Sequence, residues 1–66
     1  SRRIFKELLN YYNENGLIDL PEKHYDAFID FCNLPVDFLK YSSDYEITKT
    51  VIAQYNKYGR QSGLIK

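Results

Sequence analysis

The apolar residues of this chain recur at α-helical spacing along most of its length. In the first segment Ile4, Leu8 and Tyr12 stand four residues apart, with a second apolar row beside them. Residues three or four apart share one face of a helix, so this pattern predicts an amphipathic helix over residues 2–15. Gly16 is expected to end it, because glycine accepts the left-handed conformation just past a helix end.

A second helix is predicted to begin near Pro21, since proline needs no hydrogen-bond partner for its nitrogen in a first turn. Asp26 and Asp30 are expected to face water on its outer side. Four residues supply the inward stripe: Tyr25, Phe28, Ile29 and Cys32. Asn33 and Pro35 are expected to end this helix.

The rest of the chain predicts a short third helix and a longer fourth one. The third, of about two turns or less, has Val36 and Leu39 directed inward. Ser43 followed by Glu46 is a capping box that starts the fourth helix, and Gly59 is its expected end cap. The inward row of this last helix comprises Ile47, Val51, Ile52, Tyr55 and Tyr58.

No segment alternates with a period of two for long enough to be a strand, so the sequence predicts an all-α fold. We expect residues 1–66 to form a single small domain of four helices, with a short third helix and a longer basic C-terminal helix. A domain of this size buries only about 60% of the unfolded surface, so a partner or a second copy often adds stability. Because the sequence starts at Ser1 and not at Met, we expect it to be an excised fragment.

Cysteine usage and hydropathy suggest where the protein works. Cys32 is the only cysteine, so the chain cannot form an internal disulfide. No apolar run approaches the ~18 residues of a membrane-spanning helix, and no signal-peptide pattern is present. We therefore expect a cytoplasmic protein, or a nuclear one in a eukaryote, without a membrane partner.

Charge is segregated along the chain, although the formal net charge is zero. All nine carboxylates lie between Glu7 and Glu46, where only two lysines accompany them, which gives that stretch a net charge of −7. The flanking cations are Arg2, Arg3 and Lys6 before it, and Lys49, Lys57, Arg60 and Lys66 after it. Segregated charge creates a surface field that can orient a molecule on a charged partner.

Residue types that carry catalysis or bind metal are sparse. His24 and Cys32 are the only histidine and thiol, and eight residues of helix separate them, so they cannot form a nucleophilic pair within one element. Structural zinc needs about four such ligands. The glycines are isolated and form no phosphate-binding loop. We expect neither enzymatic activity nor a metal or cofactor.

The last predicted helix carries the candidate binding residues, which are Lys49, Asn56, Lys57, Tyr58 and Arg60. Lysine and arginine neutralise phosphates, asparagine can bond phosphates or adenine edges, and a tyrosine can stack or contact a sugar–phosphate. Helical spacing places Lys49, Asn56, Lys57 and Arg60 away from the inward row. A competing interpretation is that cations near a helix C-terminus simply complement its dipole.

A helix-turn-helix mode of binding is disfavoured. The would-be recognition helix is the short third one, which carries Asp37 and a single cation, Lys40. Ile29 also stands where that motif requires a small residue. If DNA is bound, the longer fourth helix is the better candidate for contact.

Two separated stretches resemble the small helical C-terminal domain of the DnaD/DnaB primosomal protein family. The first runs from Tyr11-Tyr12-Asn13-Glu14-Asn15-Gly16 through Asp19-Leu20-Pro21-Glu22 to Tyr25, and the second is Val51-Ile52-Ala53-Gln54-Tyr55-Asn56-Lys57-Tyr58-Gly59. That family closes with an aliphatic pair, an aromatic residue, basic residues and glycine, in a region implicated in DNA binding. The resemblance implies that Tyr55 stands at the aromatic position, in place of the usual Trp, and Lys57 among the basic residues.

The sequence therefore predicts nucleic-acid binding, with DNA as the favoured form, through backbone contacts of a basic C-terminal helix within a replication, recombination or regulatory assembly. The alternative is a protein-interaction or homodimerisation module that uses acidic and tyrosine-rich surfaces. Tyr11 or Tyr12, Tyr41 and Tyr45 exceed what so small a core can hold. Whether Arg2, Arg3 and Lys6 extend the basic surface depends on the fold.

Overall fold

The computed structural model describes residues 2–65, and this part of the chain contains helices and no strand. The elements in order are α1 (Arg2–Glu14), the 3₁₀ turn η1 (Glu22–His24), α2 (Tyr25–Cys32), α3 (Phe38–Tyr41) and α4 (Asp44–Ser62). The predicted all-α fold, with a short third helix and a longer last one, is confirmed. None of these helices is both long enough and apolar enough to cross a membrane.

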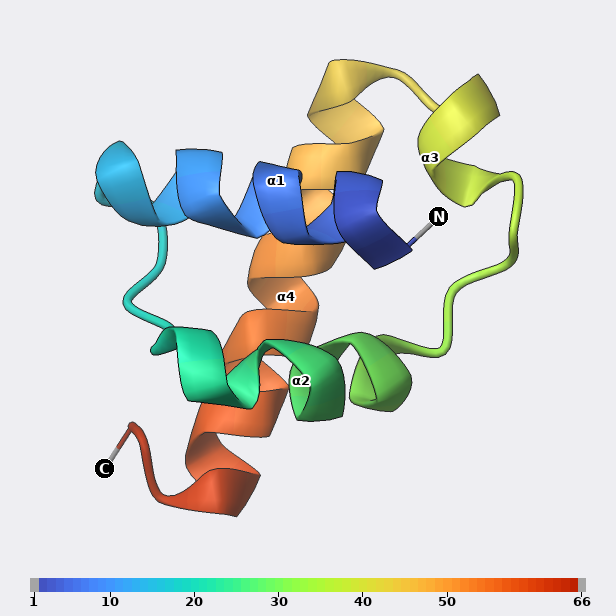
Figure 1. The fold of residues 1–66 in the computed structure, drawn as a ribbon. Helices are drawn as coiled ribbons and strands as arrows, with labels where there is room; N and C mark the ends of the chain where they lie inside the picture. Colours follow the sequence, from blue (N-terminus) through green and yellow to red (C-terminus); the bar gives the residue numbers. More distant parts are fainter. Residues whose placement is uncertain (1, 66) are drawn as a thin grey trace.

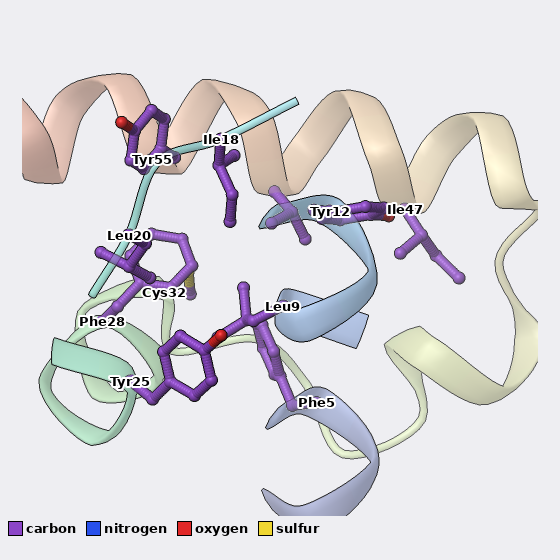
Figure 2. Packing of buried hydrophobic residues seen from close by; sticks show 11 residues of the cluster. Phe5, Leu9, Tyr12, Ile18, Leu20, Tyr25, Phe28, Cys32, Ile47 and Tyr55 are labelled. Atoms are coloured by element: carbon purple, nitrogen blue, oxygen red, sulfur yellow. The ribbon is translucent and has the colours of Figure 1, made fainter. Parts of the chain in front are cut away.

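The helices form two layers (Figure 1). The first is an antiparallel pair, with α1 crossing the N-terminal half of α4 and α2 crossing its C-terminal half. The second layer is α4 itself, and α3 lies beyond the start of α1. Figure 2 shows the single core between the layers. Its buried residues are Phe5, Leu9, Tyr12, Ile18, Leu20, Tyr25, Phe28, Cys32, Ile47, Val51 and Tyr55.

The end of α1 is a glycine-capped turn, as predicted. Gly16 has φ of 73°. The N–H of Leu17 donates to the carbonyl of Tyr12, five residues earlier, at 2.9 Å. This is the wider-spanning of the two hydrogen bonds that define a Schellman motif. Leu17 itself remains 44% exposed, and the residues that return to the core are Ile18 and Leu20. The cap thus turns the chain back under α1.

A side-chain amide fixes the connection between α1 and α2. Asn13 Nδ2 donates to the Leu20 carbonyl at 2.9 Å, and the Leu20 N–H donates to Asn13 Oδ1 at 2.9 Å. Asn13 Nδ2 also donates to the hydroxyl of Tyr25 at 2.8 Å, and that hydroxyl donates to Asn10 Oδ1 at 2.7 Å. These bonds hold the first turn of α2 against the last turns of α1.

The middle of the chain departs from the sequence prediction at both ends of α2. Pro21 leads into one 3₁₀ turn, and α2 begins only at Tyr25. Asn33 ends α2 in the left-handed conformation, with φ of 48°, as expected of a helix breaker. The prediction that Val36 points inward is wrong, because Val36 is 95% exposed. The chain forms a turn after Pro35 before α3 starts, which moves Val36 off the helical face that was assumed for it.

Gly59 is not the cap of α4. The helix continues to Ser62, and the left-handed residue that follows it is Gly63, with φ of 86°. Gly59 is buried within the helix, where an added Cβ would overlap the side chain of Ile65. The Ile65 N–H donates to the Gly59 carbonyl at 2.9 Å. Gly59 is therefore a small residue that admits the returning C-terminal segment.

Candidate nucleic-acid interface

Local sequence and core contacts together orient α4. The Ser43 hydroxyl accepts the Glu46 N–H at 3.1 Å, so the predicted N-cap forms. Ile47, Val51 and Tyr55 are buried against the other layer. A helix with its inward row fixed in this way presents its opposite face to solvent.

That opposite face is the α4 outer face, defined here by Lys49, Asn56, Lys57 and Arg60. All four residues are exposed. At about 100° per residue, Lys49, Asn56 and Arg60 fall within about 40° of one another, with Lys57 about 60° to one side. The rise from Lys49 to Arg60 is about 16 Å. The structure thus aligns four of the five predicted contact residues on one surface.

The cations of the α4 outer face have no acidic partner. Between residues 2 and 65, no carboxylate lies within 4.0 Å of Lys49, Lys57 or Arg60. The carboxylates of α4 itself, on Asp44 and Glu46, lie in its first turn. Lys49 extends over the Tyr45 ring, with 5.8 Å from Nζ to the ring centroid. Lys66 lies outside the described residues.

The N-terminal cations form ion pairs with the acidic region. Arg2 contacts Asp26 at 3.3 Å and Asp30 at 2.8 Å, and Lys6 contacts Asp26 at 3.2 Å. The hydrogen bond to Asp30 raises the pKa of Arg2 above its ordinary value. Asp26 and Asp30 are exposed as predicted. They also link α2 to α1, so they do more than face water.

Arg3 is paired as well, with Glu7 at 2.7 Å one helical turn along α1. Arg2, Arg3 and Lys6 therefore do not add unpaired charge to the α4 outer face. The basic surface is a patch on one helix and not a stripe that continues onto α1. The ion pairs of Arg2 and Lys6 join α1 to α2, so they depend on how these two helices lie against each other.

Tyr58 occupies a different position from the other predicted contacts. Its ring is half-buried against Phe28 and Phe31, with 5.5 Å between ring centroids in both cases. Its hydroxyl forms a hydrogen bond with His24 Nδ1 at 2.8 Å. The ring holds α4 to α2, and the contact of Tyr58 with a nucleotide stays a prediction. Sequence spacing placed Tyr58 on the inward row, which was the available signal for this role.

Tyr55, the aromatic residue singled out by the resemblance, is structural too. The residue is 9% exposed. Its hydroxyl accepts the Asp19 N–H and donates to the Asp19 carbonyl, both at 3.2 Å. Tyr55 thereby fastens the segment after α1 to α4.

The histidine and the thiol each have a structural environment of their own. His24 Nδ1 is hydrogen-bonded to Tyr58. Burial raises the pKa of the Cys32 thiol to about 12, far from the values of reactive cysteines. Within residues 2–65, no three His, Cys, Asp or Glu side chains are arranged to hold a metal ion.

The surface of the described residues also has two hollows, which lie away from the α4 outer face. An open apolar groove of about 330 Å³ is lined by Arg2, Phe5, Ile29, Leu34, Pro35, Val36 and Leu39. A second hollow of about 310 Å³, called here the α1–α4 cleft, is lined by Leu8, Tyr11, Tyr12, Asp44, Ile47 and Thr48. Sequence analysis missed both, because each is formed by residues from separate elements.

Comparisons with known proteins assign no family to this chain. No protein-family model, curated protein or solved structure matches it. Its function is therefore inferred from the charges and contacts of the described residues.

Proposed function

We propose that this protein binds nucleic acid, with duplex DNA as the favoured form, through the α4 outer face. The observation that supports the proposal is the contrast between two sets of cations. Arg2, Arg3 and Lys6 are neutralised by carboxylates. The cations of the α4 outer face point away from the core and have no such partner among the described residues.

The chemistry of this face suits phosphate oxygens. Lys49, Lys57 and Arg60 each supply a positive charge, and the Asn56 amide supplies a neutral donor. Three cations on one helix provide few anchors for reading bases, so contacts with the sugar–phosphate backbone dominate. Carboxylates elsewhere on the surface repel a polyanion, which orients the molecule with α4 toward the nucleic acid.

The biological setting we propose is a replication, recombination or regulatory assembly, as the resemblance to the DnaD/DnaB C-terminal domain implies. In that setting Lys57 is the basic residue common to the family pattern and the α4 outer face. Tyr55 supports α4 from within and does not contact nucleic acid.

Replacing Lys57 and Arg60 together by Ala tests the proposal. The affinity for a short DNA duplex should fall about tenfold or more, and the slope of log affinity against log salt should decrease by about 2, because two phosphate contacts are lost. Fluorescence anisotropy at several salt concentrations measures both quantities. The Tm of the variant should stay within a few degrees of the parent, since both side chains are exposed.

The matched control is Lys23→Ala with Lys40→Ala, which removes the same charge from exposed residues outside α4. This control should retain nearly the full affinity and the full salt slope. Equal losses in the two double variants would mean that net charge alone matters. An absence of duplex binding by the parent at low salt would overturn the proposal.

A second candidate function is protein recognition, and the exposed tyrosines favour it. Tyr11, Tyr41 and Tyr45 are 58%, 74% and 70% exposed. Tyr41 and Tyr45 flank the start of α4, and Tyr11 shares the α1–α4 cleft with Asp44. An aromatic interface or homodimer would be nearly insensitive to salt, in contrast to duplex binding. Sedimentation of the free protein at two salt concentrations separates the two functions.

A further inference from the structure

The α1–α4 cleft has a chemical character that differs from the rest of the surface. Its α1 side consists of Leu8, Tyr11 and Tyr12, and its α4 side of Asp44, Ile47 and Thr48. Figure 2 shows Tyr12 and Ile47 next to each other beneath the N-terminal half of α4. The cleft is thus walled by two packed helices, which fixes its shape.

The interior of the cleft is apolar with one polar pair. Leu8 is partly buried and Ile47 is buried, so they offer an aliphatic floor. The hydroxyls of Tyr12 and Thr48 are hydrogen-bonded to each other at 3.0 Å and retain lone pairs that can accept a further bond. Tyr11 forms an exposed wall, its ring 6.1 Å from that of Tyr12 and tilted by 55°.

The charge of the cleft is negative and uncompensated. Asp44 is exposed, and within residues 2–65 no Lys, Arg or His lies within 4.0 Å of its carboxylate. The cleft lining contains no basic residue. By contrast, the apolar groove beside α3 is lined by Arg2 and by no carboxylate. Of these two hollows, the α1–α4 cleft is therefore the one that joins an anion, an aromatic face and an aliphatic floor.

We propose that the α1–α4 cleft binds an arginine side chain of a partner protein. The aliphatic stem of arginine matches the floor formed by Leu8 and Ile47. Its planar guanidinium can stack on the Tyr11 ring and donate two hydrogen bonds to the Asp44 carboxylate. Lysine offers a compact ammonium that neither stacks nor bonds in this bidentate way, so arginine is preferred.

This site is independent of the proposed nucleic-acid interface. Asp44 and Thr48 belong to the side of α4 that faces α1, whereas Lys49, Asn56 and Arg60 lie on the outer face. A carboxylate in the cleft repels phosphate, so the two surfaces select partners of opposite charge. The protein can then hold a basic protein segment and a nucleic acid at the same time.

The test is a titration of the ¹⁵N-labelled protein with an acetylated and amidated pentapeptide, Gly-Ala-Arg-Ala-Gly, followed by NMR. The amide signals of Tyr11, Asp44 and Thr48 should shift, with a Kd of about 1 mM for a single anchored side chain. The same peptide with citrulline, which is isosteric with arginine but uncharged, should bind at least about tenfold more weakly.

Two variants assign the contacts. Asp44→Asn keeps the side-chain volume and should weaken the arginine peptide about tenfold, since a charge-assisted bidentate contact is lost. Tyr11→Ala should weaken it about threefold or more. Tyr41→Ala is the matched control, because Tyr41 is also an exposed tyrosine but does not line the cleft, and it should bind like the parent.

Circular dichroism of each variant checks that the fold is retained. Equal binding of the citrulline peptide, shifts confined to other residues, or unchanged affinity in Asp44→Asn would overturn the assignment. An absence of shifts in the parent at about 10 mM peptide would overturn it as well. None of these outcomes depends on whether the α4 outer face binds DNA.

Discussion

At the scale of single residues, the seven tyrosines divide into two groups with different tasks. Tyr12, Tyr25, Tyr55 and Tyr58 pack their rings between segments of the chain, and each hydroxyl bonds a residue outside its own helix. Tyr11, Tyr41 and Tyr45 remain exposed. In residues 2–65, no buried side-chain nitrogen or oxygen lacks a hydrogen-bond partner. The buried tyrosines thus connect elements by polar as well as apolar contacts.

Asn13 is the polar residue whose loss should cost most. Asn13→Ala removes its bonds to Leu20 and Tyr25 and leaves the N–H and carbonyl of Leu20 without a protein partner. We expect the free energy of unfolding to fall by about 2–3 kcal/mol and the Tm by about 10–20 °C. Urea and thermal unfolding followed by circular dichroism measure this.

Asn56→Ala is the control for that experiment. Asn56 is exposed on α4 and no protein hydrogen bond involves its side chain among the described residues, so its replacement should change stability by less than about 0.5 kcal/mol. Comparable effects of the two substitutions would contradict the role assigned to Asn13.

At the scale of elements, α4 combines three roles along one helix. Its inward row holds both helices of the first layer, its outer face carries the unpaired cations, and its last turns receive the C-terminal segment at Gly59. The helix could take all three roles because successive residues point about 100° apart. A change on one face is therefore expected to leave the others intact.

Gly59→Ala should destabilise the protein, against the usual trend for helices. Alanine in place of glycine inside a helix normally stabilises by up to about 1 kcal/mol. Here the new Cβ would displace Ile65, so we expect a net loss of about 1–2 kcal/mol. Chemical denaturation of the variant measures the change.

The double variant Gly59→Ala with Ile65→Ala identifies the cause. Shortening Ile65 removes the overlap, so the two substitutions together should cost less than the sum of their separate effects. An increase in stability for Gly59→Ala alone would show that the returning segment does not press on the helix.

At the scale of the whole molecule, one hydrophobic core lies at the centre and the charged side chains lie on the surface around it. The radius of gyration is 11.1 Å, close to the ~10.8 Å expected for a compact chain of this length. The ion pairs of Arg2 and Lys6 link α1 to α2 in one layer, and the unpaired cations lie on α4 in the other layer. Cys32 lies at the end of α2 with 7% exposure, so its thiol reports on opening of this core.

Stability should fall at high pH in part through Cys32. The unfolded thiol loses its proton near pH ~8.5–9, whereas the folded thiol has a pKa of about 12. Its contribution to folding is thus complete below about pH 9 and declines as the pH rises toward 12, because only the unfolded state deprotonates there. The stability difference between the parent and Cys32→Ala should shrink as the pH rises above about 9 toward 12.

Thiol alkylation provides an independent measurement. At about pH 8 the native protein should react with iodoacetamide far more slowly than the denatured protein, because modification requires the core to open. Rapid modification of the native state would contradict the buried position of Cys32. A parallel pH dependence of the parent and Cys32→Ala would contradict the raised pKa.

Features that depend on neighbours along the chain could be predicted from the amino-acid sequence. Helical periodicity predicted the number and order of the α-helices, the inward rows of α2 and α4, and the exposure of Lys49, Asn56, Lys57 and Arg60. Gly16 and Ser43 marked a helix end and a helix start correctly, because caps involve residues a few positions apart. These features follow from local backbone geometry.

Contacts between residues far apart in the chain became known from the fold. The pairing of Arg2 and Lys6 with α2 turned a possible basic stripe into a patch on α4. The approach of Ile65 to Gly59 changed the role that local sequence had suggested for this glycine, and the fold set the contacts of the half-buried Tyr58 ring with α2. Such contacts depend on the crossing angles and separations of helices, which no periodicity within a single helix encodes.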